Sequence, residues 1–322
     1  MPPTHGKSFL FAETRNSSEE GVALGPDAIC SLGELMGNAT LAMDVRSCRV
    51  VYTFVLGGGA SEGGARKAQL LRTKATDMRH GHDTNVTSKV KTRCLYEDPE
   101  CGGTDVTQWT LDAPQSAVTP ALRHELRAHR DDMTFLRVPE NHELGKTDTW
   151  MTYAALLARS RPDLQLGFVG KLDSDNVVKW PRYFDWLERN YRKEVEDVPF
   201  LYGGYAIHRS QCSQKHYGFV CARRGFRAEA FATGAFAYVS TPLARHVYLD
   251  GTTLEHKRGV WVLGEDLQLA NMAYSDPQVV PFVLNHRYGQ GRKLISTHCY
   301  NDPACVREKY SLAYPDADAA RQ

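Results

Sequence analysis

The hydrophobic residues of this chain fall into short apolar runs that alternate with segments of helical periodicity. The first clear run, RVVYTFVL at 49–56, is β-branched and aromatic and ends in three glycines, which is typical of a strand. Similar apolar runs predict further strands at 133–138, 164–172, 200–207, 231–240, 279–284 and 293–300. Apolar residues three and four apart predict helices at 62–74, 121–130, 145–160, 181–192 and 264–276. This alternation predicts an α/β domain in which helices flank a mostly parallel central sheet.

The same pattern suggests the domain organisation. Residues 1–45 are mixed and polar, so we expect a loose N-terminal lead-in or the remnant of a stem. Residues 46–310 carry the predicted strands and helices and are expected to form one domain. Within it, 75–115 contains Gly, Thr and Asp in quantity and resembles a surface insertion. The polar tail at 311–322 is expected to be disordered.

Composition and charge narrow the class of protein. Of 322 residues, 42% are hydrophobic and 24% are charged, which is ordinary for a globular chain. The formal net charge of +1 gives no excess that would favour nucleic acid or an anionic membrane as a partner. No stretch reaches the roughly 20 apolar residues of a membrane helix, and the apolar patch at 9–12 is too short for a signal peptide. We therefore expect membrane attachment only through an anchor that is not visible in this chain.

The eight cysteines occur as near neighbours in the sequence: Cys30 and Cys48, Cys94 and Cys101, Cys212 and Cys221, Cys299 and Cys305. An even number in close pairs is typical of local disulfides made in an oxidising lumen. Asn-x-Ser/Thr sequons at 16, 38 and 85 are consistent with a glycoprotein. Zinc binding is one alternative, although no Cys-x2-Cys pair occurs and the spacings vary. Reduced, buried cysteines are the other.

Two carboxylates follow the apolar run at 164–172, in the sequence GKLDSDN. Asp173 and Asp175 are one residue apart, with Lys171 before them, and such like charges repel unless a positive group lies between them. In sheets covered by helices, ligands bind at the carboxyl ends of strands. Mg²⁺ and Mn²⁺ favour oxygen ligands and are often completed by substrate phosphates. The pair therefore indicates a divalent cation that carries a nucleotide; the alternative is a solvated turn that caps the following helix.

Two further candidates lie near the C-terminus. Glu265 and Asp266 open an amphipathic helix, where they either cap the helix and complement its dipole or supply a general base. His298 ends a predicted strand and is either structural or a third metal ligand.

Two glycine-containing turns resemble phosphate-binding motifs without completing them. Gly57 opens LGGGASEGG, but Glu62 occupies the place of the third glycine of a dinucleotide fingerprint. A glycine-rich strand end still lets a nucleotide approach the backbone, and a flexible turn is the alternative. The segment GKT at 145–147 lacks the earlier glycine of a phosphate loop because position 140 is Glu140. We interpret it as a helix N-terminus able to help hold phosphate.

These motifs occur in a specific order along the chain. In sequence they are VVYTFVLG, ELRAHRDDMTFLRVPENHELGKTDTWMTYA, GKLDSDNVV, FLYGGYAI, FATGAFAYVS, GEDLQLA and ISTHC. Over about residues 49–306 the series resembles the β-1,3-glycosyltransferases of family 31 and the related protozoan galactosyl- and N-acetylglucosaminyltransferases. Ser174 stands where the family has the middle aspartate of three.

The resemblance implies a single GT-A-type nucleotide-diphosphate-sugar transferase domain in the Golgi that inverts the transferred sugar. It implies Mn²⁺, or Mg²⁺, held by Asp173, Asp175 and His298, and a UDP-sugar donor. It makes Asp266 the general base and Glu265 its support. The remaining residues it implies for donor or acceptor binding are Lys171, Gly234 and Ala235. UDP-galactose is the first choice of donor, UDP-N-acetylglucosamine the second, with a β-1,3 linkage to a glycan acceptor.

Two other functions compete with this interpretation. Asp-Ser-Asp-Asn-Val-Val loosely fits the nucleophile motif of haloacid-dehalogenase-type, Mg²⁺-dependent phosphatases. A catalytically degenerate transferase that binds nucleotide sugar or glycan without turnover is the third possibility, since a fold does not guarantee a function.

Overall fold

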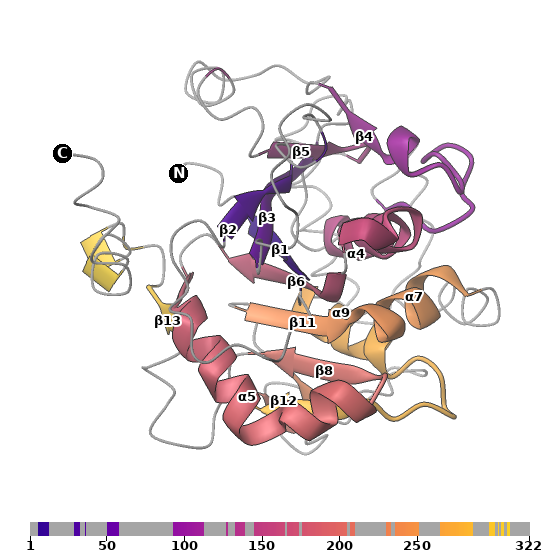
Figure 1. The fold of residues 1–322 in the computed structure, drawn as a ribbon. Coiled ribbons are helices and arrows are strands. Elements are labelled where there is room, and N and C mark those ends of the chain that lie inside the picture. Colours follow the sequence, from indigo (N-terminus) through magenta and orange to yellow (C-terminus); the bar gives the residue numbers. More distant parts are fainter. Residues whose placement is uncertain are drawn as a thin grey trace, which may run out of the picture.

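The computed structural model describes a set of segments that form one large sheet with helices on both faces, together with two small sheets (Figure 1). The described residues are 6–12, 29–32, 36, 50–57, 93–112, 127, 133–138, 145–164, 166–173, 176–204, 207–209, 230–232, 236–250, 265–285, 296–299, 302, 304–305 and 308–309.

The central sheet has nine strands among the described residues. Eight of them follow the order β12 (Phe282–Asn285), β8 (Leu201–Gly204), β11 (Phe236–Ser240), β6 (Leu166–Asp173), β1 (Gly6–Ala12), β3 (Val50–Gly57), β5 (Met133–Leu136) and β4 (Thr110–Leu111), and β2 (Ile29–Ser31) pairs with β3 outside this path. Two small sheets lie apart from it: β9 (His208–Arg209) with β10 (Ala230–Phe231), and β7 (Asn176–Val178) with β13 (Ser296–His298).

The strand directions correct the expectation of a mostly parallel sheet. β6 pairs antiparallel with both of its neighbours, β1 and β11, and β8 pairs antiparallel with β11. Two reversals restore the direction, so β8, β6 and β3 all run the same way, and their carboxyl ends lie at one edge of the sheet. β12 runs parallel to β8, and β5 runs parallel to β3. The sheet is therefore mixed, because β1 and β11 are inserted against the common direction.

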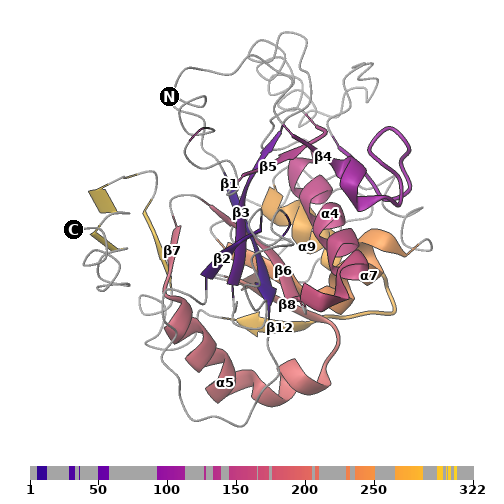
Figure 2. The same ribbon diagram turned by 45° about the horizontal axis from the view of Figure 1, so that its top comes forward.

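Helices cover the two faces of this sheet unequally. Figures 1 and 2 show α4 (Lys146–Ser160), α7 (Thr241–Leu249) and α9 (Glu265–Ala273) together on one side, and α5 (Trp180–Asp197) on the other. Two short 3₁₀ turns, η4 (Val106–Trp109) and η6 (Pro162–Leu164), flank this group. Side chains alternate along a strand, so each face of the sheet has its own apolar cluster.

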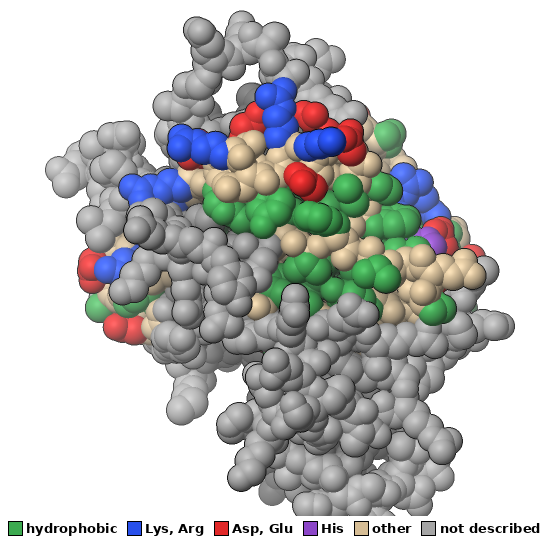
Figure 3. All heavy atoms as spheres, turned by 90° about the horizontal axis from the view of Figure 1, so that it is seen from below, with side chains coloured by type: hydrophobic (Ala, Val, Ile, Leu, Met, Phe, Trp, Pro, Cys, Tyr) green, Lys and Arg blue, Asp and Glu red, His purple; other side chains and the backbone are tan. Residues whose placement is uncertain are grey.

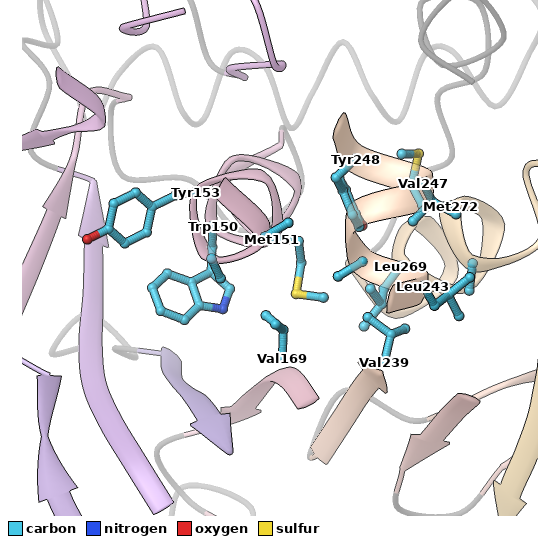
Figure 4. Packing of buried hydrophobic residues seen from close by; sticks show 14 of the residues in the cluster. Trp150, Met151, Tyr153, Val169, Val239, Leu243, Val247, Tyr248, Leu269 and Met272 are labelled. Atoms are coloured by element: carbon cyan, nitrogen blue, oxygen red, sulfur yellow. The ribbon is translucent and has the colours of Figure 1, made fainter. Parts of the chain in front are cut away.

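The larger cluster lies between the sheet and the three helices (Figure 4). Trp150 and Met151 of α4 point down onto Val169 of β6, and Leu243 of α7 meets Val239 of β11 (Figure 4). The indole Nε1 of Trp150 donates a hydrogen bond to the carbonyl of Gly170 at 3.0 Å, which ties α4 to the middle of β6. This contact fixes α4 relative to the strand that ends at Asp173.

The smaller cluster packs α5 against the opposite face, where Trp180, Tyr183 and Leu187 contact aromatic and aliphatic residues of β6 and β11. The outer surface of α5 carries i,i+4 ion pairs such as Arg189 with Asp185. Figure 3 views this side of the molecule and shows charged side chains next to a band of hydrophobic ones.

One expectation about the chain needs correction. Gly6–Ala12, expected in a loose lead-in, forms β1 at the centre of the sheet; an apolar patch too short for a signal peptide has the length of a strand. Residues 93–111, part of the expected surface insertion, are mostly exposed or half-buried, and Cys94, Cys101 and Trp109, each 1% exposed, anchor them in the larger core. The helix α7 was not predicted. The predicted helix at 62–74 and tail at 311–322 lie outside the described residues, as does most of the predicted helix at 121–130.

Two of the expected cysteine pairs are confirmed as disulfides. Cys94 is bonded to Cys101 and Cys299 to Cys305. Cys48, Cys212 and Cys221 lie outside the described residues, as does the side chain of Cys30. Within the described part of the chain, no helix combines the length and the apolar character needed to cross a bilayer.

Candidate active site

The end of β6 is the centre of the candidate site. This strand begins at Leu166 and ends at Asp173, where its partner in β1 is Gly6. β11 lies very close to it at Gly170, because a Cβ there would stand 2.7 Å from the Ala237 carbonyl oxygen. The side chain of Asp173 and the whole of Asp175 lie outside the described residues. The structure therefore places the carboxyl end of β6, after which the two carboxylates follow, with the carboxyl ends of β8 and β3.

Lys171 and Asp266 meet at this strand, although they are remote in sequence. The Nζ of Lys171 lies 3.7 Å from Oδ1 of Asp266, which is on the first turn of α9. The Lys171 side chain is 8% exposed, whereas that of Asp266 is 35% exposed. A buried ammonium fixes one side of the carboxylate while the other side reaches solvent. Such a carboxylate can accept a proton from a bound hydroxyl group, which is the requirement for a general base.

A buried tyrosine lies close to the same pair. The hydroxyl oxygen of Tyr202 accepts a hydrogen bond from the backbone N–H of Ala232 at 2.7 Å. Burial raises the pKa of Tyr202 well above its ordinary value, and the nearby charge of Asp266 adds to this effect. Tyr202 therefore stays neutral and supplies a dipole, not a charge, beside Lys171 and Asp266.

A second strand pair lies directly after the carboxylates in sequence. β7 begins at Asn176, and His298 of β13 is its antiparallel partner. His298 is thus paired with the residue that follows Asp175. Only Ser174 and Asp175 lie between Asp173 and Asn176, so the three residue steps span at most about 11 Å. The side chain of His298 lies outside the described residues. The disulfide between Cys299 and Cys305 follows at once and ties down the end of β13.

The residues that could hold a divalent cation are consistent with Mn²⁺ or Mg²⁺ in their chemistry. Two carboxylates suit either ion, and the β7–β13 pairing brings the backbone of His298 to the same region. Among the side chains that the structure describes, no group of three His, Cys, Asp or Glu residues is arranged to hold a metal. That search does not extend to Asp175 or to the side chains of Asp173 and His298.

Positive charge gathers at the start of α5, next to β7. Desolvation lowers the pKa of Lys179, and the neighbouring charges of Arg182 and Lys309 lower it further. Lys309 also forms an ion pair with Glu308. Three cations near one strand end would favour the binding of an anion such as a phosphate.

The other predicted residues are placed as follows. Gly57 ends β3, two strands away from β6, at the same edge of the sheet. Glu265 is the first residue of α9, and its side chain lies outside the described residues. Gly234 and Ala235 lie wholly outside them. The structure therefore brings Lys171 and Asp266 together and leaves Gly57 at the end of β3, a strand that lies about 10 Å from β6, the width of two strand spacings.

Sequence reasoning missed a buried polar group beside this site. Asp148, in the first turn of α4, forms an ion pair with Arg93 and accepts a hydrogen bond from Gln268 of α9. An acidic residue in the first turn of a helix is normally explained by the helix dipole, so the sequence held no signal that it is buried.

Comparisons with known proteins name no relative. No family model matches the chain, and a search of curated proteins finds no significant match.

Proposed function

We propose that this protein is an inverting, metal-dependent glycosyltransferase that moves galactose or N-acetylglucosamine from a UDP-sugar to a hydroxyl group of a glycan. The observation that carries the proposal is the 3.7 Å approach of Lys171 to Asp266. It joins the strand that ends at Asp173 to the first turn of α9, two segments that the sequence alone keeps far apart. The resemblance of the ordered motifs to β-1,3-glycosyltransferases agrees with this pairing.

In the proposed reaction Asp266 accepts the proton of the acceptor hydroxyl as that oxygen attacks the anomeric carbon. The bond from that carbon to the diphosphate breaks at the same time, and the diphosphate leaves as UDP. Inversion requires one base opposite the leaving group, which suits a single, partly exposed carboxylate. Lys171 holds that carboxylate in place. The cations at Lys179, Arg182 and Lys309 would attract the diphosphate.

Asp173, Asp175 and His298 would hold Mn²⁺ or Mg²⁺. Such a cation, when bound, would neutralise charge on the departing diphosphate. Gly57, at the same edge of the sheet, would let the nucleotide approach the backbone. Gly234 and Ala235 would line the sugar or acceptor side.

The two observed disulfides are consistent with the oxidising lumen in which Golgi transferases act. We accordingly propose a Golgi location, with a glycoconjugate as the acceptor.

Release of UDP from a panel of UDP-sugars tests this proposal. Purified protein is incubated with Mn²⁺ and each donor, with and without glycan acceptors, and UDP is measured over time. We expect release that requires the metal and falls by at least about 100-fold in Asp266→Asn, because a general base contributes 10²–10⁴-fold. Asp185→Asn, an exposed carboxylate on α5, is the matched control and should keep full activity.

Other outcomes would identify the competing functions. Phosphate release from a generic phosphoester, without UDP release, would indicate a phosphatase. Binding of a UDP-sugar without turnover would indicate a degenerate transferase. Either result contradicts the proposed function.

A further inference from the structure

The carboxylate of Asp148 links three separate parts of the fold. Asp148 is fully buried, with 0% of its surface exposed, in the first turn of α4. Its Oδ2 lies 2.8 Å from Nη2 of Arg93 in an ion pair and accepts a hydrogen bond from Nε2 of Gln268 at 3.0 Å. Its Oδ1 accepts a longer hydrogen bond, of 3.4 Å, from the hydroxyl of Tyr248 on α7. One buried charge thus joins three parts of the fold to α4: α7, α9 and the disulfide segment, which is the stretch 93–101 closed by the Cys94–Cys101 bond.

The disulfide segment presents Arg93 to Asp148 from a fixed position. Gly145, which precedes α4, has φ of 111°, and a Cβ there would stand 2.5 Å from Cβ of Arg93. The next residue, Cys94, donates its backbone N–H to Oγ1 of Thr149 at 2.9 Å and is bonded to Cys101. The left-handed glycine lets the arginine approach, and the disulfide restrains the loop beyond it.

A buried carboxylate of this kind is costly unless every partner remains in place. Removal of one partner of a buried ion pair leaves the other charge unpaired in a low-dielectric interior. Burial, and then the charge of Asp148, raise the pKa of Tyr248 well above its ordinary value, so its hydroxyl stays a donor. The carboxylate is therefore held by one ion pair and two hydrogen bonds, which come from three separate segments.

Gln268 and Asp266 fix the first turn of α9 from two directions. Two residues of a helix are separated by a rotation of about 200°, so these side chains leave the helix on nearly opposite sides. Asp266 meets Lys171 on the sheet, and Gln268 meets Asp148 on α4. Contacts on opposite sides prevent the turn from rotating about its axis. The direction of the Asp266 carboxylate thus depends on the hydrogen bond between Gln268, two residues further along α9, and Asp148.

We propose that Asp148 is a positioning residue: through Gln268 it orients the first turn of α9 and with it the carboxylate of Asp266. This inference rests on the proposed function, because it assigns a purpose to the orientation of the base. Asp148 itself contacts neither donor nor acceptor in this account.

The experiment combines hydrogen exchange with steady-state kinetics on the full chain. The variants are Asp148→Asn and Gln268→Met. Gln268→Met keeps the Arg93–Asp148 ion pair, so it still tests the inference if Asp148→Asn folds poorly. Thr152→Val is the matched control, because its buried hydroxyl bonds only the backbone carbonyl of Asp148, at 2.8 Å, among the contacts found. Exchange is followed at the amides of 269–272, whose helical acceptors are the carbonyls of 265–268.

We expect these amides to exchange about 10-fold faster in Asp148→Asn and Gln268→Met than in Thr152→Val, as for loss of one hydrogen bond to a charged group. With UDP-galactose or UDP-N-acetylglucosamine, kcat should fall about 10- to 100-fold, because small misplacements of a catalytic group have effects of this size. KM for the donor should change by less than about twofold, since α9 is not assigned to hold it.

Unchanged exchange in both variants, or an equal increase in Thr152→Val, overturns the inference. So does a kcat that stays at the wild-type value while exchange increases. If the wild-type protein releases no UDP from any donor, the proposed function is wrong, and the exchange rates alone decide whether Asp148 fixes α9.

Discussion

Removal of the disulfide between Cys94 and Cys101 should destabilise the protein more than removal of the disulfide between Cys299 and Cys305. The two bonds close loops of nearly equal length, with sequence separations of 7 and 6. Loop-closure entropy therefore gives about 2.5 kcal/mol for either bond at 25 °C. Any difference between them must come from their surroundings, which makes each bond the control for the other.

The surroundings differ in burial. Cys94 and Cys101 are each 1% exposed within the larger core, whereas only one cysteine of the other pair is buried: Cys299 is 4% exposed and Cys305 is partly exposed. Replacement of both buried sulfurs in Cys94→Ala/Cys101→Ala leaves a void, which adds about 1–2 kcal/mol to the loss. We therefore expect a total of about 4 kcal/mol for this variant and about 2.5 kcal/mol for Cys299→Ala/Cys305→Ala.

Urea unfolding of the two double variants and the wild type measures these free energies. The slope with urea should stay close to the wild-type value, so that the shift in midpoint reports stability. Equal losses in the two variants would refute the burial argument. A loss below about 1 kcal/mol for Cys94→Ala/Cys101→Ala would refute the loop-closure argument as well.

Three smaller changes test other parts of the fold. Gly170→Ala should cost about 1–3 kcal/mol in urea unfolding, because the new methyl group would stand 2.7 Å from Cβ of Tyr238; an unchanged midpoint would contradict this packing. Burial raises the pKa of Tyr153 to about 12 from its unfolded value of 10.0, so stability is complete below pH 10 and is lost as the pH rises towards 12. Tyr153→Phe should remove about 2.3 kcal/mol of that loss at pH 12, and equal alkaline unfolding of both proteins would exclude this cause. Ser240→Ala should cost about 1–2 kcal/mol in thermal unfolding, since Oγ of Ser240 caps α7, accepts the N–H of Leu201 at 3.0 Å and donates to the carbonyl of Pro199 at 2.6 Å. No change in stability would show that water replaces these three bonds.

Strong local patterns predicted the elements around the site. The helix expected at 145–160 is α4 at Lys146–Ser160, and the strand expected at 164–172 is β6 at Leu166–Asp173. Their signals are local: apolar residues at helical spacing in one case, and a continuous apolar run before a charged turn in the other. Such elements are found from sequence because their own residues specify them.

The sequence held weaker signals for β1 and α7. β1 has only a short apolar patch within a polar segment, and its place between β6 and β3 depends on partners far along the chain. α7 follows directly after an apolar run, which obscured its start, although Ser240 and the proline after it are typical of a helix N-terminus.

Sequence patterns did not predict the contacts between side chains that are far apart in the sequence. Lys171 and Asp266 were each selected as candidates, yet only the fold brings them within 3.7 Å. Asp148 was not predicted as a candidate, because its three partners come from three separate segments and no sequence pattern indicates that it is buried. The roles of Asp173, Asp175 and His298 stay predictions.

Calorimetric titration of UDP, with and without Mn²⁺, tests the central claim most directly, because it separates the two ends of the proposed site. The account predicts that wild type and Asp266→Asn bind UDP alike in the presence of Mn²⁺, whereas Asp173→Asn loses the binding that requires the metal. UDP binding that is independent of Mn²⁺ and unchanged by Asp173→Asn would contradict it.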